Sequence, residues 1–122
     1  MEHNANAITT NRLYREYVNK SRRGMVDRLF RRFMSYGISK CRCSREEHER
    51  NCRVLSIVVE KHMLMECTDI ESYNDLTTIH ERIGKILREL HNKIESIKRN
   101  VDDGNRLNRL IGVLETEYKN NA

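Results

Sequence analysis

Apolar residues recur at intervals of three and four along most of the chain, which is the pattern of amphipathic α-helices. The longest stripe runs from Leu76 to Val101, and its spacing drifts from a heptad repeat toward the period of a straight helix. That drift is typical of a helix in a bundle rather than of a long coiled coil. The stripe consists of Leu76, Ile79, Ile83, Ile86 or Leu87, Leu90, Ile94, Ile97 and Val101.

A shorter stripe near the C-terminus predicts a second helix that pairs with the first. Between the stripes, residues 102–105 have the sequence Asp-Asp-Gly-Asn, which is rich in turn-forming residues. We therefore expect an αα-hairpin over residues 75–119 with one shared apolar face. Either Thr78 or Asp75 can cap its first helix. The second stripe consists of Leu107, Leu110, Ile111 and Leu114.

The middle of the chain predicts a helix with a clear start. Ser44-Arg-Glu-Glu47 has the spacing of a capping box, in which the serine side chain accepts from the backbone N–H three residues later. The helix can run to about Glu66, and residues 67–74 then form a turn. β-Branched residues leave a short strand over residues 54–59 as an alternative. The apolar stripe of this helix consists of Val54, Leu55, Val58, Val59, Met63 and Leu64.

The N-terminal part of the chain predicts two short helices. Residues 1–8 have the features of a frayed tail, and Thr9 or Thr10 can cap the helix that follows. Gly24 is a predicted break or kink, and Gly37 is a predicted stop for the second helix. The apolar positions of that second helix are Met25, Leu29, Phe30, Phe33 and Met34.

Charge is divided unevenly between the two halves of the chain. Residues 11–53 hold thirteen Lys and Arg against five Asp and Glu, a net charge of +8, whereas residues 54–122 hold ten against twelve. Such a basic segment indicates a polyanionic partner, and we expect nucleic acid. An acidic membrane surface or an acidic protein is the alternative partner. The expected contacts are Arg12, Arg15, Lys20, Arg22, Arg23, Arg28, Arg31, Arg32, Lys40, Arg42 and Arg45.

Four potential zinc ligands lie within twelve residues: Cys41, Cys43, His48 and Cys52. In a helix that begins at Ser44, His48 and Cys52 lie one turn apart on the same face, and the other two cysteines precede the helix. Zn²⁺ prefers thiolate and imidazole ligands, and the neighbouring basic residues favour thiolates. The cluster therefore predicts one closed, structural Zn²⁺ site. Incidental packing of the thiols is the alternative.

The fourth cysteine and the N-terminus bear on the cellular compartment. Cys67 ends an apolar helix and is expected to be buried as a small hydrophobic residue, with a mixed zinc site that includes it as an alternative. No apolar run reaches the length of a membrane span, and Met1-Glu-His-Asn-Ala lacks the pattern of a secretory signal. We therefore expect an intracellular protein with reduced thiols and no contact with a membrane.

The basic segment and the cysteine cluster together resemble the small cysteine-rich nucleic-acid-binding proteins of filamentous plant RNA viruses, of carlavirus and vitivirus type. The resemblance covers about residues 20–53. It implies zinc binding, binding of single- or double-stranded nucleic acid without strong sequence preference, and suppression of RNA silencing. It also favours RNA over DNA as the partner and a location in the host cytoplasm and nucleus. The matching residues are Arg22, Arg23, Arg28, Arg31 and Arg32, followed by Cys41, Cys43, His48 and Cys52.

These observations combine into one prediction of fold and function. The fold class is all-α, with short basic N-terminal helices, a small zinc-binding loop and helix, and a C-terminal helical hairpin, divided into residues 1–53 and 54–122. With 38% hydrophobic residues, we expect a homodimer held by helices of residues 54–114, with a bundle inside one chain as the rival. No nucleophile motif or phosphate-binding glycine loop is present, so we expect no enzymatic activity and no small-molecule substrate. An α-helical adaptor for protein partners is the alternative function.

Overall fold

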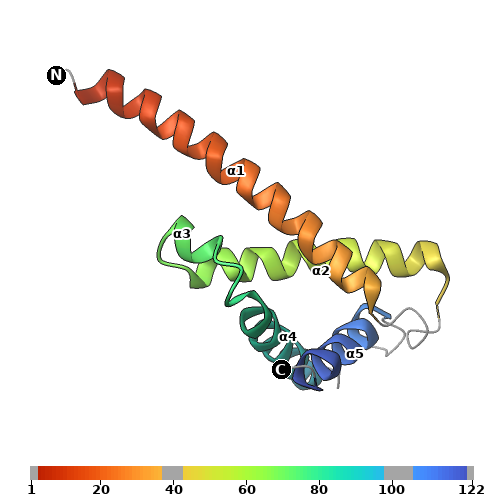
Figure 1. Ribbon diagram of the computed structural model, residues 1–122. Coiled ribbons are helices and arrows are strands. Elements are labelled where there is room, and N and C mark those ends of the chain that lie inside the picture. Colours follow the sequence, from red (N-terminus) through yellow and green to blue (C-terminus); the bar gives the residue numbers. More distant parts are fainter. Residues whose placement is uncertain (1–2, 37–42, 98–105, 121–122) are drawn as a thin grey trace.

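The computed structural model describes residues 3–36, 43–97 and 106–120, and it confirms an all-α fold. Five helices lie in these ranges, and no strand occurs in them, so the alternative strand over residues 54–59 is wrong. Figure 1 shows the helices in chain order. They are α1 (His3–Ser35), α2 (Arg45–Glu66), α3 (Ile70–Tyr73), α4 (Ile79–Ile97) and α5 (Arg106–Asn120).

The N-terminal region is one helix, which corrects two predictions. α1 begins at His3, within the expected frayed tail, and continues through Gly24, where a break was expected. Glycine inside a helix costs only about 0.5–1 kcal/mol relative to alanine. The buried stripe of Met25, Leu29 and Phe33 on the same helix is enough to outweigh that cost. The expected pair of short basic helices is therefore a single helix of 33 residues.

The predicted start and end of the middle helix are confirmed. The Ser44 side chain accepts from the backbone N–H of Glu47 at 3.2 Å, and α2 ends at Glu66. The segment expected to be a turn contains a single helical turn, α3. Its cap is Asp69, whose carboxylate accepts from the backbone N–H of Ser72 at 2.7 Å.

α4 begins later than the apolar stripe predicted. Leu76 precedes the helix and is 47% exposed, because Asp75 organises a turn by accepting from the backbone N–H of Thr77 at 3.0 Å. The helix itself starts after Thr78, whose carbonyl accepts from the N–H of Arg82 at 3.1 Å. Val101 and the predicted turn at residues 102–105 lie outside the described residues.

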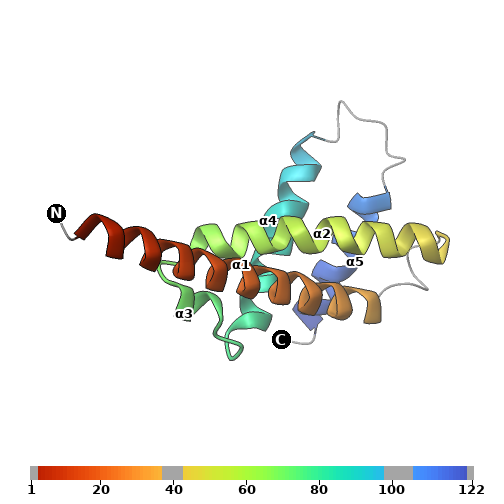
Figure 2. The ribbon, with the colours of Figure 1, turned by 90° about the horizontal axis from the view of Figure 1, so that it is seen from above.

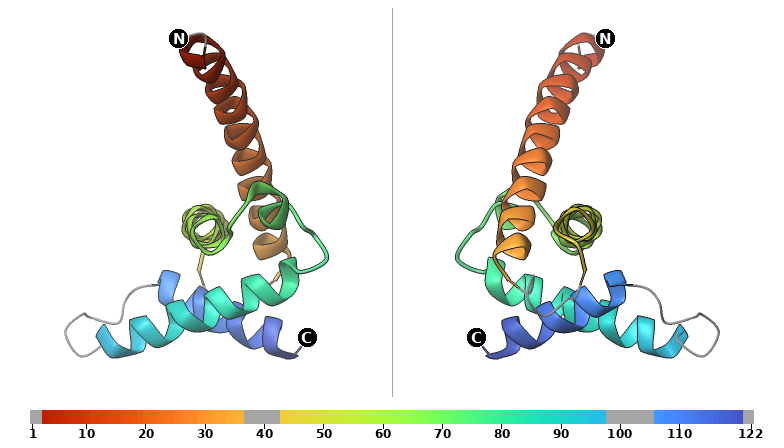
Figure 3. Two further views of the ribbon diagram at one scale, coloured as in Figure 1. Left: turned by 90° about the vertical axis from the view of Figure 1, so that its left-hand side faces the viewer. Right: turned by 90° about the vertical axis from the view of Figure 1, so that its right-hand side faces the viewer.

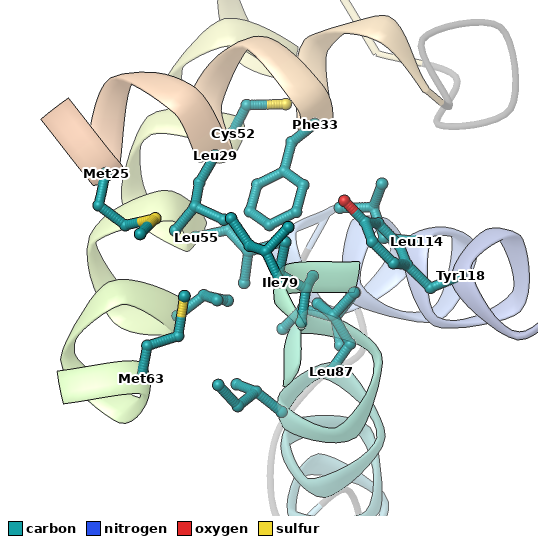
Figure 4. Packing of buried hydrophobic residues seen from close by; sticks show 14 of the residues in the cluster. Met25, Leu29, Phe33, Cys52, Leu55, Met63, Ile79, Leu87, Leu114 and Tyr118 are labelled. Atoms are coloured by element: carbon teal, nitrogen blue, oxygen red, sulfur yellow. The ribbon is translucent and has the colours of Figure 1, made fainter. Parts of the chain in front are cut away.

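The helices pack in two crossed pairs around one core. α1 lies beside α2, and α4 and α5 cross each other on one side of that pair (Figures 2 and 3). The expected boundary between residues 53 and 54 falls inside α2, and the core is continuous across it. Figure 4 shows Met25, Leu29 and Phe33 of α1, Leu55 and Met63 of α2, Ile79 and Leu87 of α4, and Leu114 and Tyr118 of α5 in this core.

The first part of the apolar stripe of α4, from Ile79 to Leu87, is buried within a single chain. Ile83, Ile86 and Leu87 are all fully buried against the other helices, as the rival bundle prediction requires. Leu90, farther along the stripe, is half-buried. These residues therefore need no second copy of the chain for their burial. The homodimer stays a prediction, and burial at these positions gives no support for it.

Candidate nucleic-acid interface and metal-binding residues

One face of α1 carries cations that are open to solvent. Lys20, Arg28 and Arg31 are exposed, and with Tyr17 and Gly24 they follow one another at intervals of three and four residues. Residues at these intervals lie on the same side of a helix. We call Lys20, Arg28 and Arg31 the basic face. None of the three forms an ion pair with another described residue.

Arg22 lies on a different side of α1 and is engaged by the fold. Its guanidinium donates two hydrogen bonds to the carboxylate of Glu60 on α2, at 2.8 and 2.9 Å. Glu60 is only 2% exposed and also accepts from the hydroxyl of buried Tyr73 at 2.8 Å. The hydrogen bonds to Glu60 raise the pKa of Arg22 above its ordinary value. Its charge is neutralised inside the protein, so it is a poor candidate for a phosphate contact.

Some of the other basic residues contact neighbouring side chains, and others are exposed to solvent. Arg32 is half-buried beside Tyr118, whereas Arg53 stacks on the ring of Phe30 at 4.0 Å and lies 3.7 Å from Asp27. The side chain of Arg12 and the residues Lys40 and Arg42 lie outside the described part of the structure. Of the predicted contacts outside the basic face, Arg15, Arg23 and Arg45 are exposed.

Two of the four predicted zinc ligands lie together in the first turns of α2. His48 Nε2 is 3.5 Å from Cys52 Sγ, and both side chains are fully buried. A tetrahedral zinc ion holds a nitrogen and a sulfur ligand about 3.6 Å apart, given ordinary bond lengths. Burial lowers the pKa of His48, which favours the neutral imidazole that a metal requires. The Nδ1 atom of His48 is buried without a hydrogen-bond partner in the described residues.

The rest of the predicted cluster is only partly described. Cys43 is half-buried and packs against the core, and Cys41 lies outside the described residues. Among the described residues, no group of three or more His, Cys, Asp or Glu is arranged to hold a metal ion. Cys67 lies at the other end of α2, fifteen residues and about 22 Å along the helix from Cys52. This distance is too long for Cys67 to share one zinc ion with His48 and Cys52, which counts against the alternative in which Cys67 replaces one of the other ligands.

Two tyrosines of α1 are available to a partner, whereas Tyr36, directly after the helix, is not. Tyr14 and Tyr17 are 54% and 51% exposed. Tyr36 is half-buried and meets the ring of Tyr118 edge-on at 5.9 Å. Tyr17 also accepts a hydrogen bond from the side-chain amide of Asn74 at 3.4 Å, which joins α1 to the end of α3. Sequence patterns could not reveal this contact, because the two residues are 57 positions apart.

Comparison with known proteins identifies no relative of this chain. No protein-family model matches the chain, and no curated protein or solved structure shows significant similarity to it. In the described residues, no helix is both long and apolar enough to cross a membrane. Functional inference therefore rests on the residues and their geometry.

Proposed function

We propose that the protein binds nucleic acid, with RNA as the first candidate, through the basic face of α1. The observation that carries this proposal is the exposure of Lys20, Arg28 and Arg31 on one side of the helix without an ion-pair partner among the described residues. A phosphate can approach such a cation without first displacing an internal carboxylate. Arg22, whose carboxylate partner is buried, provides the contrasting case on the same helix.

The geometry of the basic face suits a phosphate backbone better than a single anion. Lys20 and Arg31 are eleven residues apart, which is about 16 Å along the helix axis. That length spans several phosphates of one strand. Contacts of this kind release condensed counterions, so affinity should fall with salt and depend little on base sequence.

The test is a salt titration of a labelled RNA by fluorescence anisotropy. The variant Lys20→Gln, Arg28→Gln, Arg31→Gln should bind more weakly, and the slope of log K against log salt should fall by about 2 for single-stranded RNA. The fold should be preserved, because all three side chains are exposed.

A matched variant controls for the loss of net charge. Lys61→Gln, Arg88→Gln, Arg109→Gln also removes one lysine and two arginines, all of them exposed and on helices other than α1. It should retain most of the affinity and slope of the natural protein. Equal losses in the two triple variants would reduce the proposal to a general effect of net charge.

We also propose that one Zn²⁺ is held by His48 and Cys52 together with Cys41 and Cys43. The support is the 3.5 Å approach of His48 Nε2 to Cys52 Sγ, which matches the separation of two ligands on one zinc ion. The ion would be structural, and its binding energy would add to the stability of the first turns of α2.

Elemental analysis tests the metal proposal directly. Protein purified without chelators should contain about one zinc per chain, and Cys52→Ser should lose both the metal and part of the thermal stability. Cys67→Ser, which lies at the far end of α2, serves as the control and should keep its metal. Metal-free natural protein would reject the zinc site and leave the basic face unaffected.

A further inference from the structure

A shallow groove lies between α1 and the segment that joins α3 to α4. Its volume is about 460 Å³, which is within the range of sites for small molecules. The two walls of the groove are joined where the side chain of Asn74, at the end of α3, donates to Tyr17 and Ser21 of α1. Its lining residues are Tyr17, Lys20, Ser21, Gly24, Met25, Arg28, Asn74 and Leu76.

The groove includes two of the three cations of the basic face. Lys20 and Arg28 are eight residues apart on one side of α1, about 12 Å along its axis. Gly24 lies midway between them, and a Cβ atom added there would meet no atom of another part of the protein within 4 Å. The missing side chain leaves open space between the two charges, so a ligand can approach the helix backbone there.

Aromatic, apolar and polar groups complete the groove. Tyr17 and Leu76 are 51% and 47% exposed as whole residues, and both line the groove. Asn74 uses its side-chain NH₂ group to donate to the hydroxyls of Tyr17 and Ser21, each at 3.4 Å. Its amide oxygen is left as an acceptor for a donor on a ligand. These contacts also fix the position of Tyr17 relative to α3.

We propose that this groove receives an unstacked base of single-stranded nucleic acid. The base would lie on the ring of Tyr17, and the flanking phosphates would contact Lys20 and Arg28. Aromatic stacking beside cations is how proteins bind single strands with little sequence preference. The inference rests on the proposed function and extends it by naming the single strand as the preferred ligand.

A duplex fits this groove poorly, although it can meet the basic face. The bases of a duplex are stacked and paired, so Tyr17 could reach one only if it were flipped out of the helix, which costs free energy. Phosphates of a duplex would still contact Lys20, Arg28 and Arg31. The groove therefore predicts a preference for single strands over duplexes at the same salt concentration.

Binding of an oligouridylate and of an RNA duplex with the same number of phosphates per strand tests this inference. The single strand should bind about tenfold more tightly to the natural protein, because only its bases can stack on Tyr17. Tyr17→Leu should remove about tenfold of that affinity, because it deletes the stacking surface. Tyr14→Leu is the matched control, since this tyrosine is equally exposed but does not line the groove, and it should leave binding unchanged.

A second variant fills the groove without disturbing the core. Gly24→Leu introduces a side chain where there is open space, and it replaces glycine inside a helix, so circular dichroism should show an intact fold. We expect weaker binding of the oligouridylate and unchanged binding of the duplex. An effect on both ligands in equal measure would overturn the groove as a site for bases.

The outcomes separate this inference from the proposed function. If Tyr17→Leu and Gly24→Leu bind the oligouridylate as well as the natural protein while the basic-face variant does not, the groove is rejected and the proposed function stands. A duplex that binds more tightly than the single strand leads to the same conclusion. If the basic-face variant also binds the oligouridylate as well as the natural protein does, the proposed binding through the basic face and the proposed base site in the groove are both wrong.

Discussion

Two sides of α1 use basic residues in opposite ways. On the side toward α2, Arg22 forms two hydrogen bonds with Glu60, which is buried and holds the hydroxyl of Tyr73 as well. On the side toward solvent, Lys20 and Arg28 have no ion-pair partner among the described residues. The same helix therefore contains a cation committed to folding and cations available to a ligand, and their positions differ by as little as two residues.

The comparison shows that the role of a basic residue depends on whether a buried carboxylate or solvent surrounds its charge. Arg22 is a partner for a carboxylate that is only 2% exposed, and a buried charge without a partner is strongly unfavourable. The cations of the basic face lie in water, where an unpaired charge costs nothing. Substitutions on the first side should change stability, and substitutions on the second side should change binding.

Replacing Glu60 should have the largest effect on stability. Glu60→Ala leaves Arg22 and the buried Tyr73 hydroxyl without their acceptor, and we expect a loss of about 2–4 kcal/mol. This range includes a reduction for solvent screening, because the Arg22 side chain is 34% exposed. Urea denaturation measures the loss, and Glu49→Ala, an exposed position on the same helix, should change stability by less than about 0.5 kcal/mol.

Removing the hydroxyl of Tyr73 should have a smaller effect that depends on pH. Burial, followed by the hydrogen bond to Glu60, raises the pKa of Tyr73 well above its ordinary value. The neutral phenol is therefore favoured in the folded state, and its contribution is present below about pH 10 and lost as the pH rises further. Tyr73→Phe should cost about 1.5 kcal/mol at neutral pH.

Denaturation at a series of alkaline pH values checks the second part of this prediction. Stability of the natural protein should decline above about pH 10, and Tyr73→Phe should decline less steeply. Part of the decline should remain, because burial also raises the pKa of Tyr118. Identical curves for the two proteins would show that Tyr73 does not couple ionisation to folding.

Replacing Gly24 by alanine should stabilise the protein slightly. The position is exposed and helical, and the added Cβ meets no atom within 4 Å. We expect a gain of about 0.5–1 kcal/mol in the free energy of unfolding. A loss of stability measured by thermal denaturation would mean that the backbone at Gly24 is not an ordinary helix.

A single substitution on the basic face should have the smallest effect on stability. Arg28→Gln should change the free energy of unfolding by less than about 0.5 kcal/mol, because its side chain is exposed. It should still lower the slope of log K against log salt for single-stranded RNA by about 0.7. A large loss of stability would show that Arg28, like Arg22, stabilises the folded protein.

Local signals in the sequence predicted the helices well where the determining residues are close together. Ser44 and Glu47 define the start of α2, and the spacing of Leu110, Ile111 and Leu114 defines α5. Gly24 misled the prediction because a local preference of about 1 kcal/mol competes with burial of a whole stripe. Tyr118 was not expected in the core, since it lies among polar residues near the end of the chain.

The candidate site was harder to predict, because its contacts join distant parts of the chain. Charge alone placed Arg22 and Arg28 in one group, and only the position of Glu60, 38 residues after Arg22, separates them. Asn74 and Leu76 were assigned to a turn and an apolar stripe, yet both line the groove on α1. The periodicity of the sequence predicts individual helices, but it does not indicate which loop lies beside which helix.

The first half of α1 should be less stable than the second half, because the helix extends beyond the other helices. Figure 1 shows this half projecting away from the other helices, and Tyr17 is the first residue of α1 with a described hydrogen bond to another part of the chain, at Asn74. A helical segment of this length gains little stability from its own hydrogen bonds in water. Its amide hydrogens should therefore exchange with solvent faster than those near Leu29 and Phe33. Slower exchange of the same amides upon addition of RNA would show that part of the binding energy is used to order this arm.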